Sequence, residues 1–348
     1  MQLAIATLLS TLLVYTSNAG SGGWDHDPTS MIGPKYWGNV SAICRDGRKQ
    51  SPINIVPPST IYQPYPALNL TVPEGNAVFK FGNGGHDVSG HPVVSSGGNI
   101  LLRGGPLGAA YKFHNIHIHY GNKSMPASEH SVERARTTGE LHAVFYNSSF
   151  TTLSDAAADN SSSAIAVIGI RFAAGLWVNE SYYHAGLQSF FENVASLTYK
   201  GNETTHSFNM SDLLRPEDID RFYTYEGSLT TPNCQETVQW LVMEKTQYVR
   251  STLIDAISHF RSGNTLTSKL IIGNARPVQA LNGRTIYRNF QIPQSEPSIA
   301  PSTWRTGNAS ASTTPVVSTA TSGVAPIAAA PVVLTTTVLV FTFATLKN

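Results

Sequence analysis

The stretch YKFHNIHIHYG, residues 111–121, places His117 and His119 two positions apart within an apolar run. Successive side chains of a β-strand point to opposite faces, so a strand here carries both imidazoles on one face and Ile116 and Ile118 on the other. Two histidines on one face of an apolar strand indicate either the polar, solvent-facing side of an edge strand or the ligands of a metal ion. The rest of the sequence decides between these two interpretations.

Other segments of apolar or alternating residues, bounded by Gly, Pro or Asn, predict further strands. They are Ala77–Phe81, Asn99–Arg103, Glu140–Asn147, Ala164–Phe172 and Thr237–Glu244. Apolar residues at helical spacing predict two helices, and these are His184–Leu197 and Gln247–Ser262. Strands outnumber helices and do not alternate with them. We therefore expect a mainly β (α+β) fold, with one domain over residues 24–293 around a large, mostly antiparallel twisted sheet with peripheral helices.

The overall composition excludes several classes of function. The chain has 348 residues, of which 41% are apolar, and a formal net charge of +1. It has no basic stripe, and it lacks the GxxxxGKS and GxGxxG patterns that bind phosphate groups. We therefore expect no nucleic-acid partner and no nucleotide chemistry.

The N-terminal residues predict export from the cell. An apolar stretch, Leu3–Tyr15, precedes the small residues Ser17–Ala19, which together predict a signal peptide over residues 1–19. Sequons for N-glycosylation agree with a secretory path. They begin at Asn39, Asn69, Asn122, Asn147, Asn160, Asn179, Asn202, Asn209 and Asn308.

The C-terminal residues change in character. Residues 294–323 are rich in Ser, Thr, Ala and Pro, a composition typical of an extended stalk. The tail, residues 324–348, contains an apolar run, Val332–Leu346, that as a helix would reach roughly 22 Å, short of the ~30 Å hydrocarbon core. This pattern favours a cleaved GPI-attachment signal, with Ser322 as the attachment residue, and hence a lipid anchor in the outer leaflet at the cell surface. A secreted protein with a hydrophobic tail is the alternative.

The chain contains two cysteines, Cys44 and Cys234. In an oxidising compartment an even pair favours one disulfide, and two buried free thiols are the alternative. Ligation of zinc by these thiols is therefore disfavoured.

A third strand-borne histidine supports the metal interpretation. In GELHAVFYN, residues 139–147, Glu140 and His142 share one face of the predicted strand. Catalytic zinc commonly takes three protein ligands and leaves a fourth position to water, which a close pair of histidines and a distant third can satisfy. Each ligating imidazole also needs a partner for its second nitrogen. Glu140 is placed to serve His142, and Asn115 is placed to serve His117.

Several short runs of the sequence together resemble the α-class carbonic anhydrases. The runs keep the family's order and span most of the predicted domain. They are GPKYW (33–37), QSPINI (50–55), NGGH (83–86), GGPL (104–107), HIHYG (117–121), SEH (128–130), ELHAV (140–144), YEGSLTTPNC (225–234) and NARPVQALNGR (274–284). The resemblance implies the family's fold, its Zn²⁺ cofactor and its reaction, in which zinc-bound hydroxide reversibly hydrates carbon dioxide to bicarbonate and a proton.

Carried over residue by residue, the resemblance implies that His117, His119 and His142 bind the zinc ion. Cys44 and Cys234 match positions where extracellular members of the family place a disulfide. Asn115 stands where a longer glutamine is usual, which shortens its reach toward His117.

The resemblance also implies the catalytic roles. Thr230 accepts a hydrogen bond from the zinc-bound hydroxide and donates its own to Glu129. His86 matches the position of the histidine that relays the proton to bulk water. Its surroundings lack the asparagines and the tyrosine common in the family, which predicts slower proton transfer. The implied substrate pocket comprises Val144, Val167, Leu229, Thr230, Thr231, Val238 and Trp240.

The alternative function comes from a different class of protein. The family also contains catalytically silent domains that serve in binding or adhesion, and these usually lack one or more zinc histidines. Because this chain keeps all three, we expect an enzyme, and zinc content is the property that separates the two possibilities.

Overall fold

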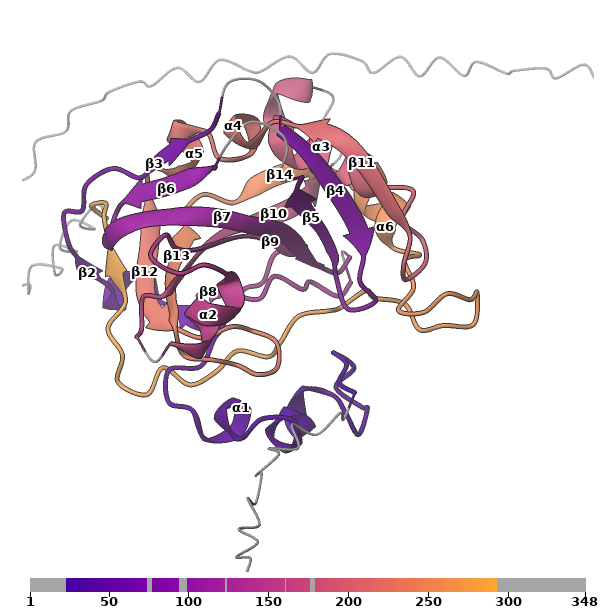
Figure 1. Ribbon diagram of the computed structural model, residues 1–348, viewed down its shortest axis with the longest axis horizontal. Coiled ribbons are helices and arrows are strands. Elements are labelled where there is room, and N and C mark those ends of the chain that lie inside the picture. Colours follow the sequence, from indigo (N-terminus) through magenta and orange to yellow (C-terminus); the bar gives the residue numbers. More distant parts are fainter. Residues whose placement is uncertain are drawn as a thin grey trace, which may run out of the picture. The chain divides into compact units, whose positions relative to one another are not determined.

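Strand β7 (Leu107–Tyr120), which contains the paired histidines, lies inside a 13-stranded mixed sheet (Figure 1). This computed structural model describes residues 23–292 apart from 74–76, 94–98, 123, 160 and 176–178. These described residues lie within one compact unit, Met1–Gln294. The predicted signal peptide, stalk and C-terminal tail with Ser322 lie outside the described residues, as do the sequons at Asn160 and Asn308.

The helices are short and the strands carry most of the structure. The strands are β1 (Asn54–Ile55), β2 (Ile61–Tyr62), β3 (Asn69–Thr71), β4 (Ala77–Asn83), β5 (Val88–Pro92), β6 (Leu101–Gly104), β7, β8 (Ser131–Val132), β9 (Gly139–Asn147), β10 (Ile165–Gly175), β11 (Glu203–Phe208), β12 (Phe222–Gly227), β13 (Val238–Met243), β14 (Gln247–Arg250) and β15 (Tyr287–Arg288). The helices are α1 (Ala42–Asp46), α2 (Leu153–Ala158), α3 (Ala185–Val194), α4 (Met210–Leu213), α5 (Pro216–Ile219) and α6 (Ser251–Ile257), with 3-10 turns η1 (Pro34–Asn39), η2 (Pro57–Ser59) and η3 (Glu180–Tyr182).

Antiparallel pairing dominates the sheet around the histidines. β7 pairs antiparallel with β5 on one side and with β9 on the other, and β9 pairs antiparallel with β10. β10 in turn runs parallel to β13 and β14, and β15 runs parallel to β2, so the sheet is mixed. The predicted fold, one domain around a large, mostly antiparallel sheet with few helices, is confirmed.

One predicted helix is partly wrong. The first part of Gln247–Ser262 forms strand β14, and only α6 beyond it is helical. Gln247 and Val249 are buried whereas Tyr248 is exposed, which is the two-residue alternation of a strand. Val249 fits a helical stripe equally well, so spacing alone assigned it to the wrong element. The other predicted helix, His184–Leu197, is present as α3.

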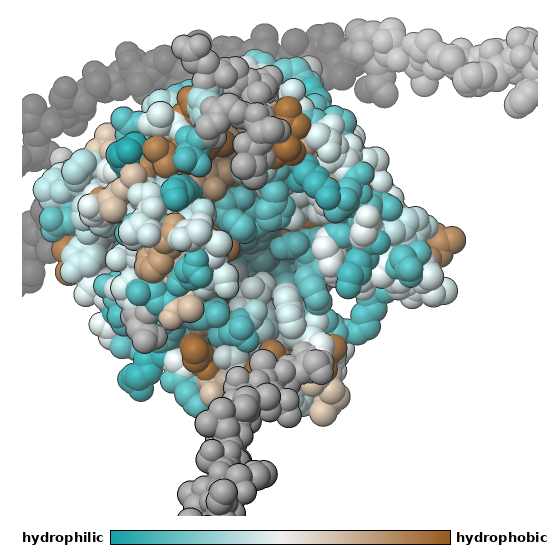
Figure 2. All heavy atoms as spheres, in the orientation of Figure 1, coloured by the Kyte–Doolittle hydropathy of each residue, from teal (hydrophilic) through white to brown (hydrophobic). Residues whose placement is uncertain are grey.

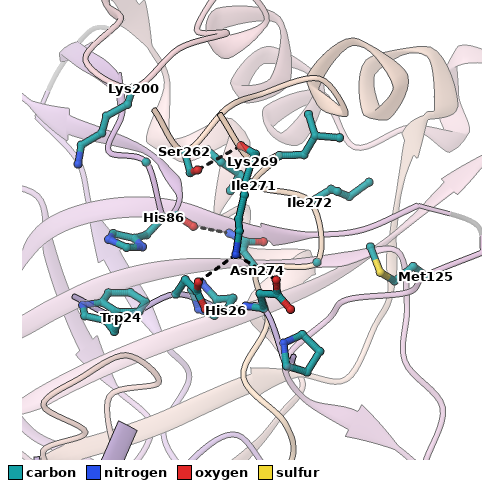
Figure 3. A pocket seen from close by; sticks show the side chains of 16 residues that line it. Trp24, His26, His86, Met125, Lys200, Ser262, Lys269, Ile271, Ile272 and Asn274 are labelled. Carbon is teal, nitrogen blue, oxygen red and sulfur yellow. Dashed lines mark hydrogen bonds and ion pairs between the residues drawn. The ribbon is translucent and has the colours of Figure 1, made fainter. Parts of the chain in front are cut away.

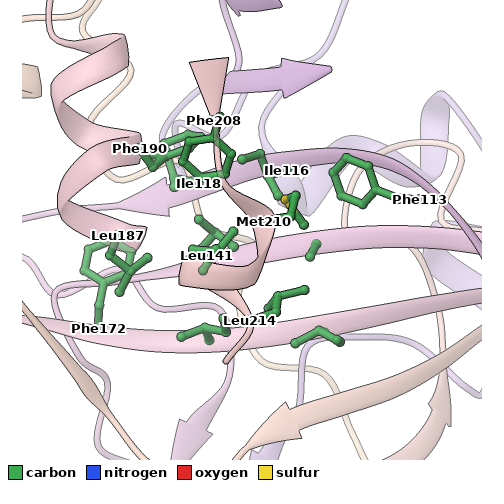
Figure 4. Close-up of a cluster of buried hydrophobic side chains, with 14 of the residues drawn as sticks. Phe113, Ile116, Ile118, Leu141, Phe172, Leu187, Phe190, Phe208, Met210 and Leu214 are labelled. Carbon is green, nitrogen blue, oxygen red and sulfur yellow. The ribbon is translucent and has the colours of Figure 1, made fainter. Parts of the chain in front are cut away.

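Alternation along the central strands divides the apolar side chains between two clusters on opposite faces of the sheet. The larger cluster contains Phe190 of α3, Met210 of α4 and Ile118 of β7 (Figure 4). Val144 of β9 belongs to the smaller cluster. His142, two residues before Val144, points to that same face, so the smaller cluster borders the histidines.

The predicted disulfide between Cys44 and Cys234 is confirmed. It joins helix α1 to the segment that precedes β13, and it links positions 190 residues apart in the sequence. Among the residues that the structure describes, no helix is both long and apolar enough to cross a bilayer.

Candidate metal centre

Three histidine side chains converge on one face of the sheet. The antiparallel register of β7 and β9 places His117 directly opposite His142, and His119 lies two residues further along β7 on the same face. Ring centroids are 5.2 Å apart for His117 and His119, 5.1 Å for His117 and His142, and 4.7 Å for His119 and His142. One nitrogen from each ring lies within 4.8 Å of the others. The structure thus brings together the three residues predicted as zinc ligands.

Hydrogen bonds determine which nitrogen of two of these rings carries the proton. Nδ1 of His119 donates to the carbonyl oxygen of Asn274 over 2.7 Å, and Nε2 of His142 donates to a carboxylate oxygen of Glu140 over 3.0 Å. Both acceptors lack a proton, so the lone pairs lie on Nε2 of His119 and Nδ1 of His142. Nε2 of His119 is buried and has no hydrogen-bond partner among the described residues. Such outer partners orient a metal-binding imidazole and raise its basicity.

Glu140 is the centre of a buried hydrogen-bond chain. It also accepts from the backbone N–H of His130 over 2.8 Å and from Nδ1 of His130 over 2.7 Å, while Nε2 of His130 lies 2.7 Å from the hydroxyl of Tyr225. Burial alone would raise the pKa of Glu140, but His130 and His142 hold it well below its ordinary value, so Glu140 is a carboxylate. His130, Glu140 and His142 are themselves close enough to form a ligand group. The polar atoms of this second group hydrogen-bond to one another and are not available to a metal ion. We therefore assign the group a supporting role, in which it orients His142 within the three-histidine cluster.

The predicted hydrogen bond between Asn115 and His117 is absent. Nδ1 of His117 and the side-chain oxygen of Asn115 are both buried without a partner among the described residues. The register against β9 is regular from Asn115 to His117, so both side chains lie on one face of β7, but asparagine is one methylene shorter than the glutamine usual at this position and makes no hydrogen bond to the ring. Burial, followed by the proximity of His142 and His119, lowers the pKa of His117 well below its ordinary value. The ring is therefore neutral, which is the state that binds a metal.

The predicted hydrogen bond from Thr230 to Glu129 is also absent from the described structure. Glu129 is fully buried, and one of its oxygens accepts from the backbone N–H of Arg276 over 2.8 Å. The other oxygen has no hydrogen-bond partner among the described residues and lies 3.6 Å from Nε2 of His119. The carboxylate thus faces the histidine cluster, and Thr230 is buried in the segment between β12 and β13.

His86, the predicted proton relay, stacks on Trp24. Their ring centroids lie 4.0 Å apart with the planes inclined by 13°. Both residues line a pocket of about 560 Å³ (Figure 3), and so does Asn274, whose carbonyl oxygen holds His119. Partial burial lowers the pKa of His86, and the nearby Asp87 carboxylate opposes this effect. His86 therefore lines a pocket that reaches the candidate metal centre through Asn274.

Sequence reasoning missed two residues of this region. The side-chain amide of Asn274 donates to the carbonyl oxygens of His86 (3.1 Å) and Ile118 (3.0 Å), so this residue ties His86 to strand β7. Its position at the start of the NARPVQALNGR run was the signal that could have identified it. His26 is buried, its Nε2 has no partner among the described residues, and its ring lies edge-on to that of His119 at 6.2 Å. No sequence pattern marked His26.

Apolar side chains border the histidines, as the resemblance implied. The ring of Trp240 lies 4.9 Å from that of His142. Figure 2 shows a hollow with hydrophilic residues in the middle of the face over β7 and β9. Thr231 is partly exposed, and Leu229 packs against the smaller cluster. The other predicted pocket residues, Val144, Val167, Val238 and Trp240, are buried within that cluster.

These residues fit a zinc ion. Three imidazoles without a thiolate match a donor set that catalytic zinc commonly takes. Nε2 of His119 is a buried acceptor without a protein partner, an arrangement that costs free energy unless a ligand satisfies it. His117 and His142 both have lowered pKa values, chiefly from burial, and so present neutral rings near pH 7.

Comparisons with known proteins agree with this geometry. The family model for the eukaryotic-type carbonic anhydrase matches residues 32–290. Carbonic anhydrase 3 of Rattus norvegicus is 28% identical over 264 residues, which cover 75% of this chain and 97% of the relative. Carbonic anhydrase 7 of Homo sapiens is 28% identical over 276 residues, covering 78% of this chain and 99% of the relative. A Caenorhabditis elegans protein whose name calls it carbonic anhydrase-like is 27% identical over 288 residues, or 78% of this chain and 81% of the relative. The chain therefore belongs to the eukaryotic-type carbonic anhydrase family.

Proposed function

We propose that the protein is an active, zinc-dependent carbonic anhydrase that reversibly converts carbon dioxide and water to bicarbonate and a proton. The observation that carries this proposal is the cluster of His117, His119 and His142. One ring nitrogen of His119 donates to Asn274 and one of His142 donates to Glu140, so the other nitrogen of each ring carries the lone pair that can bind a metal. Zinc bound there supplies Lewis acidity and makes water nucleophilic near neutral pH.

The chain's own residues position the reactants. The free oxygen of the buried Glu129 carboxylate is available to accept a hydrogen bond from the hydroxyl of Thr230, and the threonine oxygen could then only accept a further hydrogen bond. The apolar surfaces of Val144 and Trp240 favour a small uncharged substrate such as carbon dioxide over water. His86, partly exposed at the neighbouring pocket, exchanges the released proton with bulk solvent.

The test is stopped-flow hydration of carbon dioxide by the purified protein, with zinc quantified in each preparation. We expect about one zinc per chain in the wild type and loss of both zinc and activity in His142→Ala, because removal of one of three ligands opens the site. His206→Ala serves as the matched control, since His206 is exposed on strand β11. Stoichiometric zinc with no hydration in the wild type would refute the proposal, and substoichiometric zinc would favour a silent binding domain.

We also propose that the protein acts at the cell surface. The Cys44–Cys234 disulfide supports an oxidising compartment, in agreement with the predicted signal peptide and sequons. The predicted GPI anchor at Ser322 is tested by treating intact cells with a phosphatidylinositol-specific phospholipase. Release of the protein together with a control anchored protein is expected, and retention of the protein alone contradicts the anchor.

A further inference from the structure

A second pair of histidines lies apart from the three-histidine cluster. His91 of β5 and His114 of β7 face each other with ring centroids 5.4 Å apart and planes at 88°. The corresponding values are 5.2 Å and 75° for His117 and His119, and 5.1 Å and 88° for His117 and His142. The second pair therefore has nearly the same ring spacing and inclination as the histidine rings of the candidate metal centre.

The β-bulge in β7 explains why His114 takes part in this pair. Phe113 and Ile116 are both buried in the larger core cluster, so the two residues between them lie on the opposite face. A bulge often re-aims a side chain beside a functional site. β5 pairs antiparallel with β7, and Ser89 of β5 lies opposite His117. His91 follows two residues later, so its side chain lies on the same face of the sheet as His117 and next to the bulge.

Both imidazoles are free to bind a ligand. His114 forms no hydrogen bond to another described residue, and His91 forms one, between its Nε2 and the hydroxyl of Ser89 at 3.4 Å, the long limit for such a bond. The two rings line a pocket of about 420 Å³, which leaves room for an ion with water. Burial lowers the pKa of His114 to about 4, and partial desolvation lowers the pKa of the more exposed His91 ring, so both rings are neutral at pH 7.

The charged groups around the pair balance one another. Asp87 acts on His91 as a nearby negative charge, and Lys80 acts as a positive one. Lys80 lies opposite His91 in the register of β4 and β5, but its ammonium group is engaged with Glu203 at 2.7 Å. The nearby positive charge on β4 is therefore already paired. On β7, the ammonium group of Lys112 lies over the ring of Tyr146 at 5.8 Å, and this ring also contacts His114, so Lys112 adds one positive charge that weakens binding of a cation at the pair.

We propose that His91 and His114 bind a second divalent transition-metal ion, with water in its remaining coordination positions. For nitrogen ligands the expected order of affinity places Cu²⁺ above Zn²⁺ and Ni²⁺. Two ligands, of which one has a single weak outer partner in Ser89, predict weaker binding than at the three-histidine cluster. The inference does not rest on the proposed enzymatic activity.

The experiment is titration of Cu²⁺ into the untagged full-length protein after loading with zinc, followed by electron paramagnetic resonance and by zinc analysis. We expect one copper per chain with two nitrogen ligands and unchanged zinc. His91→Ala or His114→Ala should each weaken copper binding by more than about tenfold, because even loss of an outer partner of a ligand costs that much. His206→Ala is the control, since this exposed ring contacts Thr204 on β11 and lies outside the pair.

Unchanged copper affinity in the His91→Ala/His114→Ala double variant would overturn the proposal. Loss of zinc in step with copper uptake would also overturn it, because copper would then occupy the three-histidine cluster. Since His91 is exposed and His114 is only partly buried, alanine leaves no core cavity, and circular dichroism verifies the fold. If His114→Ala misfolds, His114→Gln preserves the size of the side chain while removing the imidazole. The copper readout does not depend on hydration activity, so an inactive enzyme leaves the test intact.

Discussion

Replacing Glu140 with glutamine removes its negative charge while preserving its shape. One carboxylate oxygen accepts from Nε2 of His142 at 3.0 Å and from Nδ1 of His130 at 2.7 Å, and the other accepts from the backbone N–H of His130 at 2.8 Å. Whichever way the glutamine amide turns, its NH₂ group faces at least one of these donors. A buried donor left without an acceptor costs about 1–3 kcal/mol, so the zinc-free protein should lose that much free energy of unfolding.

The effect on zinc affinity follows from the same contacts. Without its carboxylate partner, the ring of His142 is less firmly oriented and less basic, which typically weakens metal binding about 10–100-fold, or about 1.4–2.7 kcal/mol. The assay is competition for zinc with a chelator of known affinity, run beside urea unfolding of the zinc-free protein. Glu226→Gln is the matched control, because Glu226 is about half exposed (47%) and pairs with Lys49 at the surface.

A zinc dissociation constant of Glu140→Gln equal to that of the wild type would refute the role assigned to Glu140. A fall in the free energy of unfolding with unchanged zinc affinity would show that the carboxylate stabilises the fold through its hydrogen bonds to His130 and has no role in metal binding. The control variant should match the wild type in both measurements.

Three further predictions concern other parts of the chain. Burial would raise the pKa of Asp218, but hydrogen bonds from His184 and Arg215 outweigh burial and lower the pKa below its value of about 3.9 in the unfolded chain. The ionised Asp218 therefore stabilises the fold above about pH 3.9, and this stabilisation is lost as the pH falls below that value. Asp218→Asn should cost about 1–3 kcal/mol at pH 7 and flatten the acid side of the curve of unfolding free energy against pH. Removing both Cys44 and Cys234 should lower the unfolding free energy by up to about 5 kcal/mol, measured by urea denaturation, because the bond constrains a separation of 190 residues. His86→Ala should lower kcat about 10²-fold with kcat/KM unchanged and recover with imidazole buffer; a loss confined to kcat/KM would contradict a relay.

The convergence of the three histidines could be predicted from sequence because it depends on local rules. Alternation along a strand places His117 and His119 on one face, and the same rule pairs Glu140 with His142. The register that brings His142 opposite His117 is a long-range property, and only the order of the matching runs pointed to it. The fold class followed in the same way, from the count and arrangement of apolar segments.

The features that could not be predicted depend on side-chain reach or on distant contacts. Alternation places Asn115 on the face of His117, as expected, but a shared face does not guarantee a hydrogen bond, and the short asparagine side chain leaves Nδ1 of His117 without a partner among the described residues. The carbonyl of Asn274 reaches His119 across 155 residues of sequence, and a backbone acceptor leaves no signature in residue type. His26 was missed because its role comes from the rings around it, which no local pattern describes.

Strand β7 supplies histidines to two places, and what surrounds each ring determines how firmly it is held. At the cluster, His119 and His142 are buried and each has a strong acceptor on the nitrogen opposite its lone pair. Such rings have lost their rotational freedom before any ligand arrives, so an ion that binds there pays little further entropy. His114 has no such acceptor among the described residues and lies at a partly exposed bulge, so ordering its ring must occur on binding. The same residue type on one strand would therefore hold an ion tightly at the cluster and an exchangeable one at the bulge, as proposed.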